Sequence, residues 1–161
     1  MAKSWCSPLL KLIYLVNSHF FMKYLVDTCV WRDFYENRLS KTGKPIGKQA
    51  HDFFINAIKN KDKIFFSEVL TIELSKDYSV EEINEMLNIL FLNGILSKID
   101  ITKDESLEAE KLSLSRNLPF ADCLNAIQAR NNNAVLISQD KHFFKYLSDI
   151  AITKKPNQIG F

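Results

Sequence analysis

From residue 22 onward, short apolar runs alternate with longer segments in which apolar residues recur at helical spacing. The runs 23–26, 63–66, 95–101 and 134–137 have the length and composition of strands. Strands that are separated by helices pair in parallel through right-handed crossovers, which places helices on both faces of one sheet. The alternation therefore predicts an α/β chain with three layers, α/β/α, around a mainly parallel central sheet.

Helices are expected between these strands. Their apolar spacing indicates helices over 46–60, 68–76, 80–92, 104–115 and 119–130. Ser67 is a suitable N-cap for the second of them, and Pro119 is a suitable first residue for the last. A short edge strand is expected at 150–152.

Composition limits the class of protein. The chain has 161 residues, 47% hydrophobic and 25% charged, with four Gly and four Pro, which is typical of one folded domain rather than a disordered chain. A net charge of +2 attracts no nucleic acid by itself, so an RNA partner would need a local basic patch. Three cysteines without a CxxC pair indicate a reducing cytoplasm rather than disulfides or a zinc site.

Residues 1–21 are expected to form an extension outside the fold. Their apolar stretch is interrupted by Lys11 and by 17–19, no small-residue cleavage site follows, and the stretch is too short to cross a bilayer. Met22 comes directly before the first strand and is the expected start. The predicted domain is therefore 22–161, with no membrane partner.

Four acidic residues occupy positions where such sheets carry chemistry. Asp27 and Asp140 follow the first and fourth strands, and ligands bind beyond the carboxyl ends of parallel strands. Glu73 falls within the apolar arc of its helix, where a carboxylate needs a compensating partner. Asp122 shares a face of small residues with Asn125. Each acid alone has an ordinary explanation as a cap, a turn residue or an ion-pair partner, but together they predict one site.

Clustered carboxylates repel one another unless a cation lies between them. Their oxygen atoms are the ligands that Mg²⁺ and Mn²⁺ prefer, and such an ion can activate water and stabilise displacement at a phosphate. The pattern therefore predicts hydrolysis of a phosphodiester. It does not predict histidine chemistry, because His19, His51 and His142 fall in unrelated places along the chain.

The segments around these acids resemble the PIN-domain family, in particular the prokaryotic toxin ribonucleases of the VapC type. The resemblance runs from about residue 23 to 159. Four segments in order carry it: YLVDT at 24–28, TIEL at 71–74, LPFADCLNA at 118–126 and AVLISQDKHF at 134–143.

The resemblance implies a Rossmann-like sheet and an endoribonuclease that depends on Mg²⁺ or Mn²⁺. It implies that metal is held or organised by Asp27, Glu73, Asp122 and Asp140. Thr28 and Ser138 match hydroxyl residues that support such a site, whereas Cys29 stands where the family often has Ser or Asn. The resemblance also implies a homodimer and a cognate antitoxin whose tail enters the active-site groove.

The densest basic stretch, residues 38–63, is the expected contact for RNA phosphates, through Lys41, Lys44 and Lys48. Its ordinary alternative is a solvated helix face. Two other functions stay open. One is a phosphotransferase with Asp27 as nucleophile, although Cys29 occupies the place of its usual second acid. The other is a non-catalytic PIN-like scaffold that binds RNA or protein.

Overall fold

The structure, a computed structural model, describes residues 21–159, so the expected extension 1–21 lies outside the described residues apart from Phe21. The strands are β1 (Lys23–Val26), β2 (Lys63–Phe66), β3 (Leu96–Lys98), β4 (Val135–Ile137) and β5 (Thr153–Lys154). The helices are α2 (Thr28–Glu36), α3 (Ile46–Asn60), α4 (Glu68–Leu74), α5 (Val80–Leu92), α6 (Lys103–Arg116), α7 (Phe120–Asn131), α8 (Lys141–Tyr146) and the 3₁₀ helix η1 (Pro156–Gln158).

The five strands form one parallel sheet in the order β3-β2-β1-β4-β5. β1 lies in the middle, with Tyr24 in register with Ile64 of β2 and with Val135 of β4. After β1 the chain builds outward through β2 and β3, and it later returns to the other side of β1 to add β4. This reversal of strand order lies between β1 and β4, and parallel sheets bind ligands beyond the carboxyl ends of strands at such a point.

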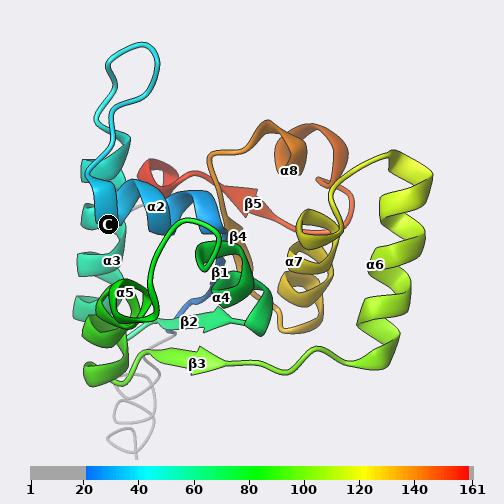
Figure 1. Cartoon of the computed structure of the whole chain (residues 1–161), viewed down its shortest axis with the longest axis horizontal. Helices are drawn as coiled ribbons and strands as arrows, with labels where there is room; N and C mark the ends of the chain where they lie inside the picture. The colour runs from blue at the N-terminus through cyan, green and yellow to red at the C-terminus, as the bar shows by residue number, and fades with distance from the viewer. Residues whose placement is uncertain (1–20, 160–161) are drawn as a thin grey trace, which may run out of the picture.

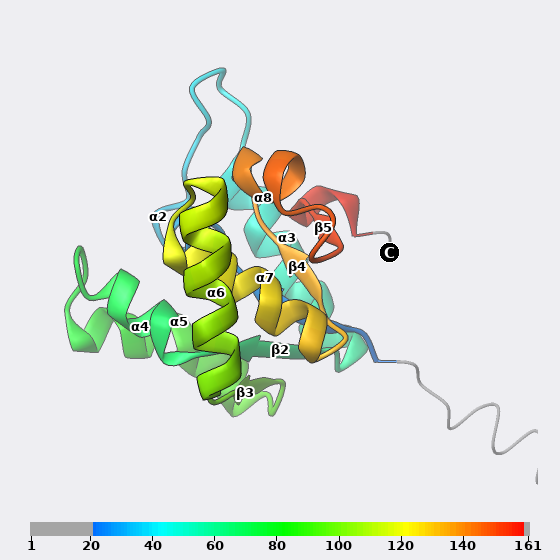
Figure 2. The same cartoon turned by 90° about the vertical axis from the view of Figure 1, so that its right-hand side faces the viewer.

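Helices cover both faces of the sheet, as the alternating pattern predicts (Figure 1). One face packs against α2, α3 and α5, through a core that contains Trp31, Phe53 and Phe54. The other face packs against α7 and α8, through a core that contains Leu124 and Phe143. The view in Figure 2 shows α6 lying outside α7. The predicted three-layer α/β/α architecture is therefore confirmed.

The predicted edge strands are the elements that differ most. β3 covers only Leu96–Lys98 of the expected 95–101, although Ile95 and Ile99 still exchange backbone hydrogen bonds with β2. The expected strand at 150–152 is displaced to Thr153–Lys154, because the backbone amides of Ile150 and Ala151 close a turn onto Leu147. Only Ile152 of the expected segment joins the ladder, through its carbonyl.

Within residues 21–159, no helix is long and apolar enough to span a membrane.

Candidate functional site

Asp27 lies between the carboxyl ends of β1 and β4. Its backbone amide donates to the carbonyl of Ile137 at 2.9 Å, which fixes the residue beside the end of β4. Its side chain is only 6% exposed, and its Oδ2 accepts a hydrogen bond from the Ser138 hydroxyl at 2.9 Å. The carboxylate does not cap α2, although Asp27 occupies the N-cap position. The ordinary capping role therefore does not account for this acid.

The pKa of Asp27 is raised to about 6, mainly because the carboxyl group is buried. The negative charges of Asp122 and Glu73 raise it further, whereas hydrogen bonds from Cys29 and Ser138 act to lower it. Asp27 therefore ionises at a higher pH than an ordinary carboxyl group, because burial disfavours its negative charge. A cation placed among these acids would stabilise the ionised form of Asp27.

Glu73 reaches the same region from α4. Its Oε2 accepts a hydrogen bond from the Thr28 hydroxyl at 2.5 Å, which joins α4 to the first turn of α2. Arg32 strengthens this contact, because its guanidinium donates to the Glu73 carbonyl at 3.3 Å and pairs with Asp77 at 2.7 Å. Glu73 is half-buried rather than central in an apolar arc, since its neighbour Ile72 is 56% exposed. The predicted helix phase was therefore partly wrong, although Glu73 does join the acids.

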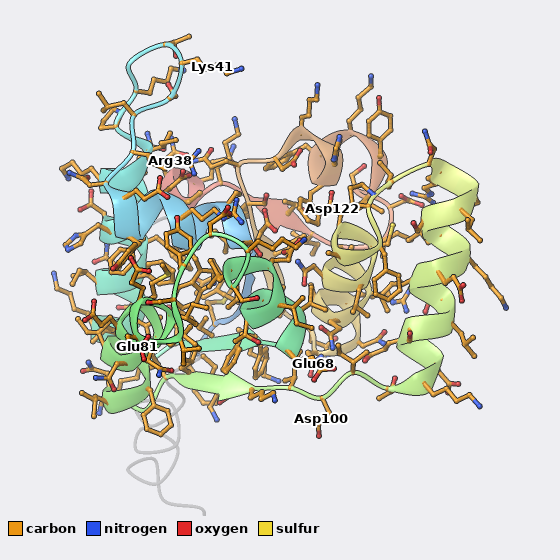
Figure 3. All side chains as sticks on the ribbon, in the orientation of Figure 1. Arg38, Lys41, Glu68, Glu81, Asp100 and Asp122 are labelled. Atoms are coloured by element: carbon orange, nitrogen blue, oxygen red, sulfur yellow. The ribbon has the colours of Figure 1, made fainter. Side chains whose placement is uncertain are left out.

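Asp122, in the first turn of α7, faces the beginning of α8 (Figure 3). Its Oδ2 lies 3.1 Å from Nδ1 of His142, and the same nitrogen lies 3.7 Å from Oδ1 of Asp140. Burial raises the pKa of Asp122, the hydrogen bond with His142 lowers it, and the charges of Asp140 and Glu73 raise it. One ligand atom from each of Asp122, Asp140 and His142 lies within 4.8 Å of the others. These three side chains lie close enough together to bind one metal ion.

Ser138 connects the two halves of the site. While its hydroxyl donates to Asp27, it accepts from the backbone amide of Asp140 at 2.9 Å. Asp140 in turn caps α8, because its Oδ1 accepts from the backbone amide of His142 at 2.9 Å. Asp140 therefore has the turn role that was expected as its alternative, and it also lies beside Asp122 and His142. These bonds hold both carboxylates in fixed positions.

Cys29 lies beside this network. Its sulfur accepts from the backbone amide of Gln139 at 3.4 Å and lies 3.6 Å from the Ser138 hydroxyl oxygen. Burial, followed by the charge of Asp27, raises the pKa of the thiol well above its usual value. The side chain is therefore a neutral, protonated neighbour of Asp27, so the polar contact expected of a Ser or Asn is kept in a weaker form.

A comparison with protein families finds that the PIN domain model matches residues 24–147, which is most of the chain. The chain belongs to the PIN-domain family. A comparison with curated proteins finds no significant match.

Solved structures share the PIN fold at low sequence identity. VapBC2 from Rickettsia felis bound to a promoter DNA fragment has 19% identity and a TM-score of 0.57, over 83% of this chain and 98% of that one. DNA-bound VapBC from Salmonella typhimurium has 12% identity and a TM-score of 0.58, over 84% and 99%. A toxin–antitoxin complex from Klebsiella pneumoniae has 15% identity and a TM-score of 0.55, over 83% and 97%.

His142 is the residue of this PIN domain that the sequence interpretation missed. The interpretation that His142 falls in a place unrelated to the acids was wrong, because the ring of His142 contacts Asp122. A signal existed in Asp140-Lys141-His142. An acid that caps a helix brings its carboxylate close to the backbone amide two residues later, and the side chain of that residue begins there. The contact with Asp122 on another helix could not be read from this spacing.

The remaining predicted residues lie at different distances from the acids. Asn125 is buried on α7 about one turn beyond Asp122, and no hydrogen bond among the described residues joins it to the acids. Lys41 lies in the exposed loop between α2 and α3, and Figure 3 shows it well apart from Asp122. Lys44 belongs to the same loop, whereas Lys48 lies on α3 and pairs with Asp52 at 2.5 Å. A role for these lysines in binding RNA stays a prediction.

Proposed function

We propose that this PIN domain is a metal-dependent endoribonuclease that hydrolyses RNA phosphodiester bonds, and that it is the toxin of a type II toxin–antitoxin pair. The observation that carries the proposal is the mutual effect of the acids. Asp27, directly after β1, and Asp122, on α7, both have pKa values raised mainly by burial, and the charge of Glu73 raises each further. Burying several like charges together is costly without a cation.

The side chains fit a divalent cation such as Mg²⁺ or Mn²⁺. The proposed ligands or organisers are Asp27, Glu73, Asp122 and Asp140, which offer the carboxylate oxygens that these ions prefer. When bound, the cation would supply activation of water and compensation for negative charge on the phosphate. Ser138 and Thr28 would hold Asp27 and Glu73 in place through the hydrogen bonds described above.

Two groups of lysines support a polyanionic substrate. Lys41 and Lys44 lie in the loop between α2 and α3, and among residues 21–159 they form no ion pair, whereas Lys48 is engaged by Asp52. Lys141 and Lys145 are exposed on α8, the helix that Asp140 caps, and they also form no ion pair within the described chain. Because Lys141 directly follows Asp140, a phosphate at the acids could have a neighbouring phosphate bound on α8.

Protein partners are supported by apolar surface and by the structural neighbours, which are toxin–antitoxin complexes. Phe91 and Leu92 on α5 are 68% and 75% exposed. Phe91 also lines a groove of about 510 Å³ between α5 and β3, together with Phe66, Leu87 and Leu96. Apolar side chains gathered in this way are typical of protein interfaces. We infer a homodimer and a cognate antitoxin in the cytoplasm, where the free thiols of Cys29 and Cys123 would stay reduced.

The test is cleavage of a mixed RNA pool in the presence of Mg²⁺ or Mn²⁺, with wild type, Asp27→Asn and an EDTA control. Asp52→Asn is the matched control variant, because Asp52 is an exposed acid on α3 with a single lysine partner. We expect wild type and Asp52→Asn to cut RNA, and we expect cleavage to be lost in Asp27→Asn and in EDTA. If folded wild type cuts no RNA with either metal, the nuclease proposal fails and the non-catalytic scaffold takes its place.

The phosphotransferase alternative is disfavoured by two observations. The PIN domain model matches residues 24–147, so most of the chain is accounted for by a different family. In addition, Oδ2 of Asp27 is occupied by the Ser138 hydroxyl, and the side chain is buried. Incubation with a phosphoryl donor followed by mass spectrometry would reveal a phosphorylated Asp27, and we expect none.

A further inference from the structure

His142 differs from the other polar residues of the site, because it brings a nitrogen atom to a cluster of carboxylate oxygens. It is the second residue of α8, directly after Lys141, and its side chain is about one third exposed. Its Nδ1 lies 3.1 Å from Asp122 and 3.7 Å from Asp140. Solvent therefore reaches the imidazole, while the ring nitrogen faces both acids.

We propose that His142 is a direct nitrogen ligand of the divalent cation held by Asp122 and Asp140, and that it makes the site favour first-row transition ions such as Mn²⁺ over Mg²⁺. The inference rests on the proposed metal site, and it assigns that site a ligand and a metal preference.

The spacing of the three side chains fits a shared ion. In octahedral coordination with bonds of about 2.1 Å, neighbouring ligand atoms lie about 3 Å apart and opposite ones about 4 Å apart. The separations of Nδ1 from the two carboxylate oxygens fall in this range, and all three ligand atoms lie within 4.8 Å of one another. Side chains on α7 and α8 can therefore reach one ion without a change of backbone.

Asp140, one of the two acid partners of His142, is held in place before any ion binds. Asp140 is fixed from two sides, because its backbone amide donates to Ser138 and its carboxylate accepts from the backbone of His142. Asp122 projects from the first turn of the buried helix α7. Ligands that are fixed in this way lose little conformational entropy on binding, which favours coordination over a loose ion pair.

The ligand chemistry gives the preference. Mg²⁺ binds oxygen atoms and keeps several waters, whereas imidazole nitrogen is a common ligand of first-row transition ions. A site with one nitrogen and two carboxylates therefore gains more affinity for Mn²⁺ than for Mg²⁺, relative to a site with oxygen ligands alone. The alternative is that His142 only donates a hydrogen bond to Asp122, in which case the ring would affect both ions alike.

The test uses the full chain loaded with Mn²⁺ and compares wild type with His142→Asn, His142→Ala and a matched control, His51→Asn. Asparagine keeps a hydrogen-bond donor near the position of Nδ1 but removes the imidazole. His51 is a second histidine that stacks on Phe34 from α3, and it belongs to the other face of the sheet. Circular dichroism establishes that each variant is folded.

Electron spin-echo envelope modulation, a pulsed EPR measurement on the bound Mn²⁺, then detects a coordinated imidazole nitrogen through the modulation that the nitrogen produces. We expect nitrogen modulation in wild type and in His51→Asn, and we expect none in the two His142 variants. Competition between the ions, followed by thermal shift, should show the preference for Mn²⁺ over Mg²⁺ falling by about tenfold or more in both His142 variants. Bound Mn²⁺ without nitrogen modulation in wild type, or an unchanged metal preference in His142→Asn, would overturn the proposal.

The same samples separate this inference from the nuclease proposal. If wild type cuts RNA with Mn²⁺ but shows no nitrogen modulation, the nuclease stands and the histidine ligand is wrong. If nitrogen modulation is present but RNA is not cut, the ligand assignment stands and the nuclease proposal fails. If wild type binds no Mn²⁺ at all, both fail.

Discussion

The Asp27 carboxylate destabilises the fold at neutral pH, although the proposed function needs it. It is almost fully buried, and two other acids raise its pKa, which reaches about 6 from an ordinary value of 3.8. A carboxyl group with a folded pKa above its unfolded pKa contributes stability below the unfolded value, and this contribution is lost as the pH rises through the folded pKa. A shift of this size corresponds to about 3 kcal/mol. The metal-free protein should therefore lose stability between about pH 4 and pH 6 on this account.

Removing the charge of Asp27 should stabilise the metal-free protein. We expect Asp27→Asn to raise the free energy of unfolding in EDTA by about 2–3 kcal/mol at pH 7, because the amide has no charge to bury. The gain should disappear near pH 4, where the wild-type carboxyl is protonated. Urea unfolding at the two pH values measures this, with the exposed Asp52→Asn as control. An equal loss of stability at both pH values would mean that the charge of Asp27 is compensated without metal.

Thr28 offers a second test at this scale, because its methyl and hydroxyl groups can be separated by substitution. Thr28→Val keeps the shape of the side chain and removes the hydrogen bond to Glu73. We expect metal-dependent cleavage to fall by about tenfold, which is typical when a group that orients a ligand is lost. Thr28→Ser keeps the hydroxyl and should stay close to wild type. Cleavage rates at saturating metal decide the matter, and equal rates for Val and Ser would remove Thr28 from the site.

Single residues also show what the sequence could and could not predict. Asp27 and Asp140 were predictable, since residues just after parallel strands meet at one edge of the sheet. Glu73 was chosen from a helical arc whose phase was partly misjudged, as the exposure of Ile72 shows. His142 was missed because its contact with Asp122 depends on how α8 packs beside α7, and local spacing carries no information on that packing.

At the scale of elements, amphipathic helices were predicted better than edge strands. α3 and α5 have the expected bounds, because each presents one buried stripe over several turns. β3 and β5 pair on one side only and have three and two residues, so turns at their ends decide where they begin. α8 was not predicted as a helix, although it is the element that carries His142.

The surface of α8 yields a prediction on RNA binding. Lys141 and Lys145 are exposed on the helix that Asp140 caps. We expect Lys141→Ala combined with Lys145→Ala to weaken RNA binding and to reduce its dependence on salt, because each phosphate contact releases counterions.

The comparison for this prediction is the pair Lys41→Ala with Lys44→Ala, in the loop between α2 and α3. Binding of a fluorescent RNA in EDTA, where cleavage is excluded, is measured over a range of salt concentrations. A flatter salt dependence for the α8 pair alone would place the substrate over α8. If only the loop pair has this effect, the original expectation for Lys41 and Lys44 is right and α8 does not bind the backbone.

At the scale of the whole molecule, the acids and the apolar groove belong to different parts of the sheet. The acids gather beyond the carboxyl ends of β1 and β4, at the point where strand order reverses. The groove lies beside β3, at the opposite edge of the sheet from β5. A partner on the groove would therefore leave the acids accessible to substrate, so association through α5 is compatible with catalysis.

This arrangement predicts that Phe91 supports association between copies of the chain. Its ring is largely exposed beside the groove, and burying such a side chain against a partner stabilises an interface by about 1.5–3 kcal/mol. We expect wild type to elute as a dimer in size-exclusion chromatography with light scattering, and Phe91→Glu to elute as a monomer because it places a charge in that interface. Leu114→Glu, at a 79% exposed apolar position on α6, is the matched control and should stay dimeric.

Phe91→Glu should also keep metal-dependent cleavage, since α5 contributes none of the acids. If Phe91→Glu is dimeric, or if wild type is already monomeric, the groove does not join copies of the chain. The groove would then be the binding surface for the antitoxin. In that case co-purification with the antitoxin should be lost in Phe91→Glu and kept in Leu114→Glu.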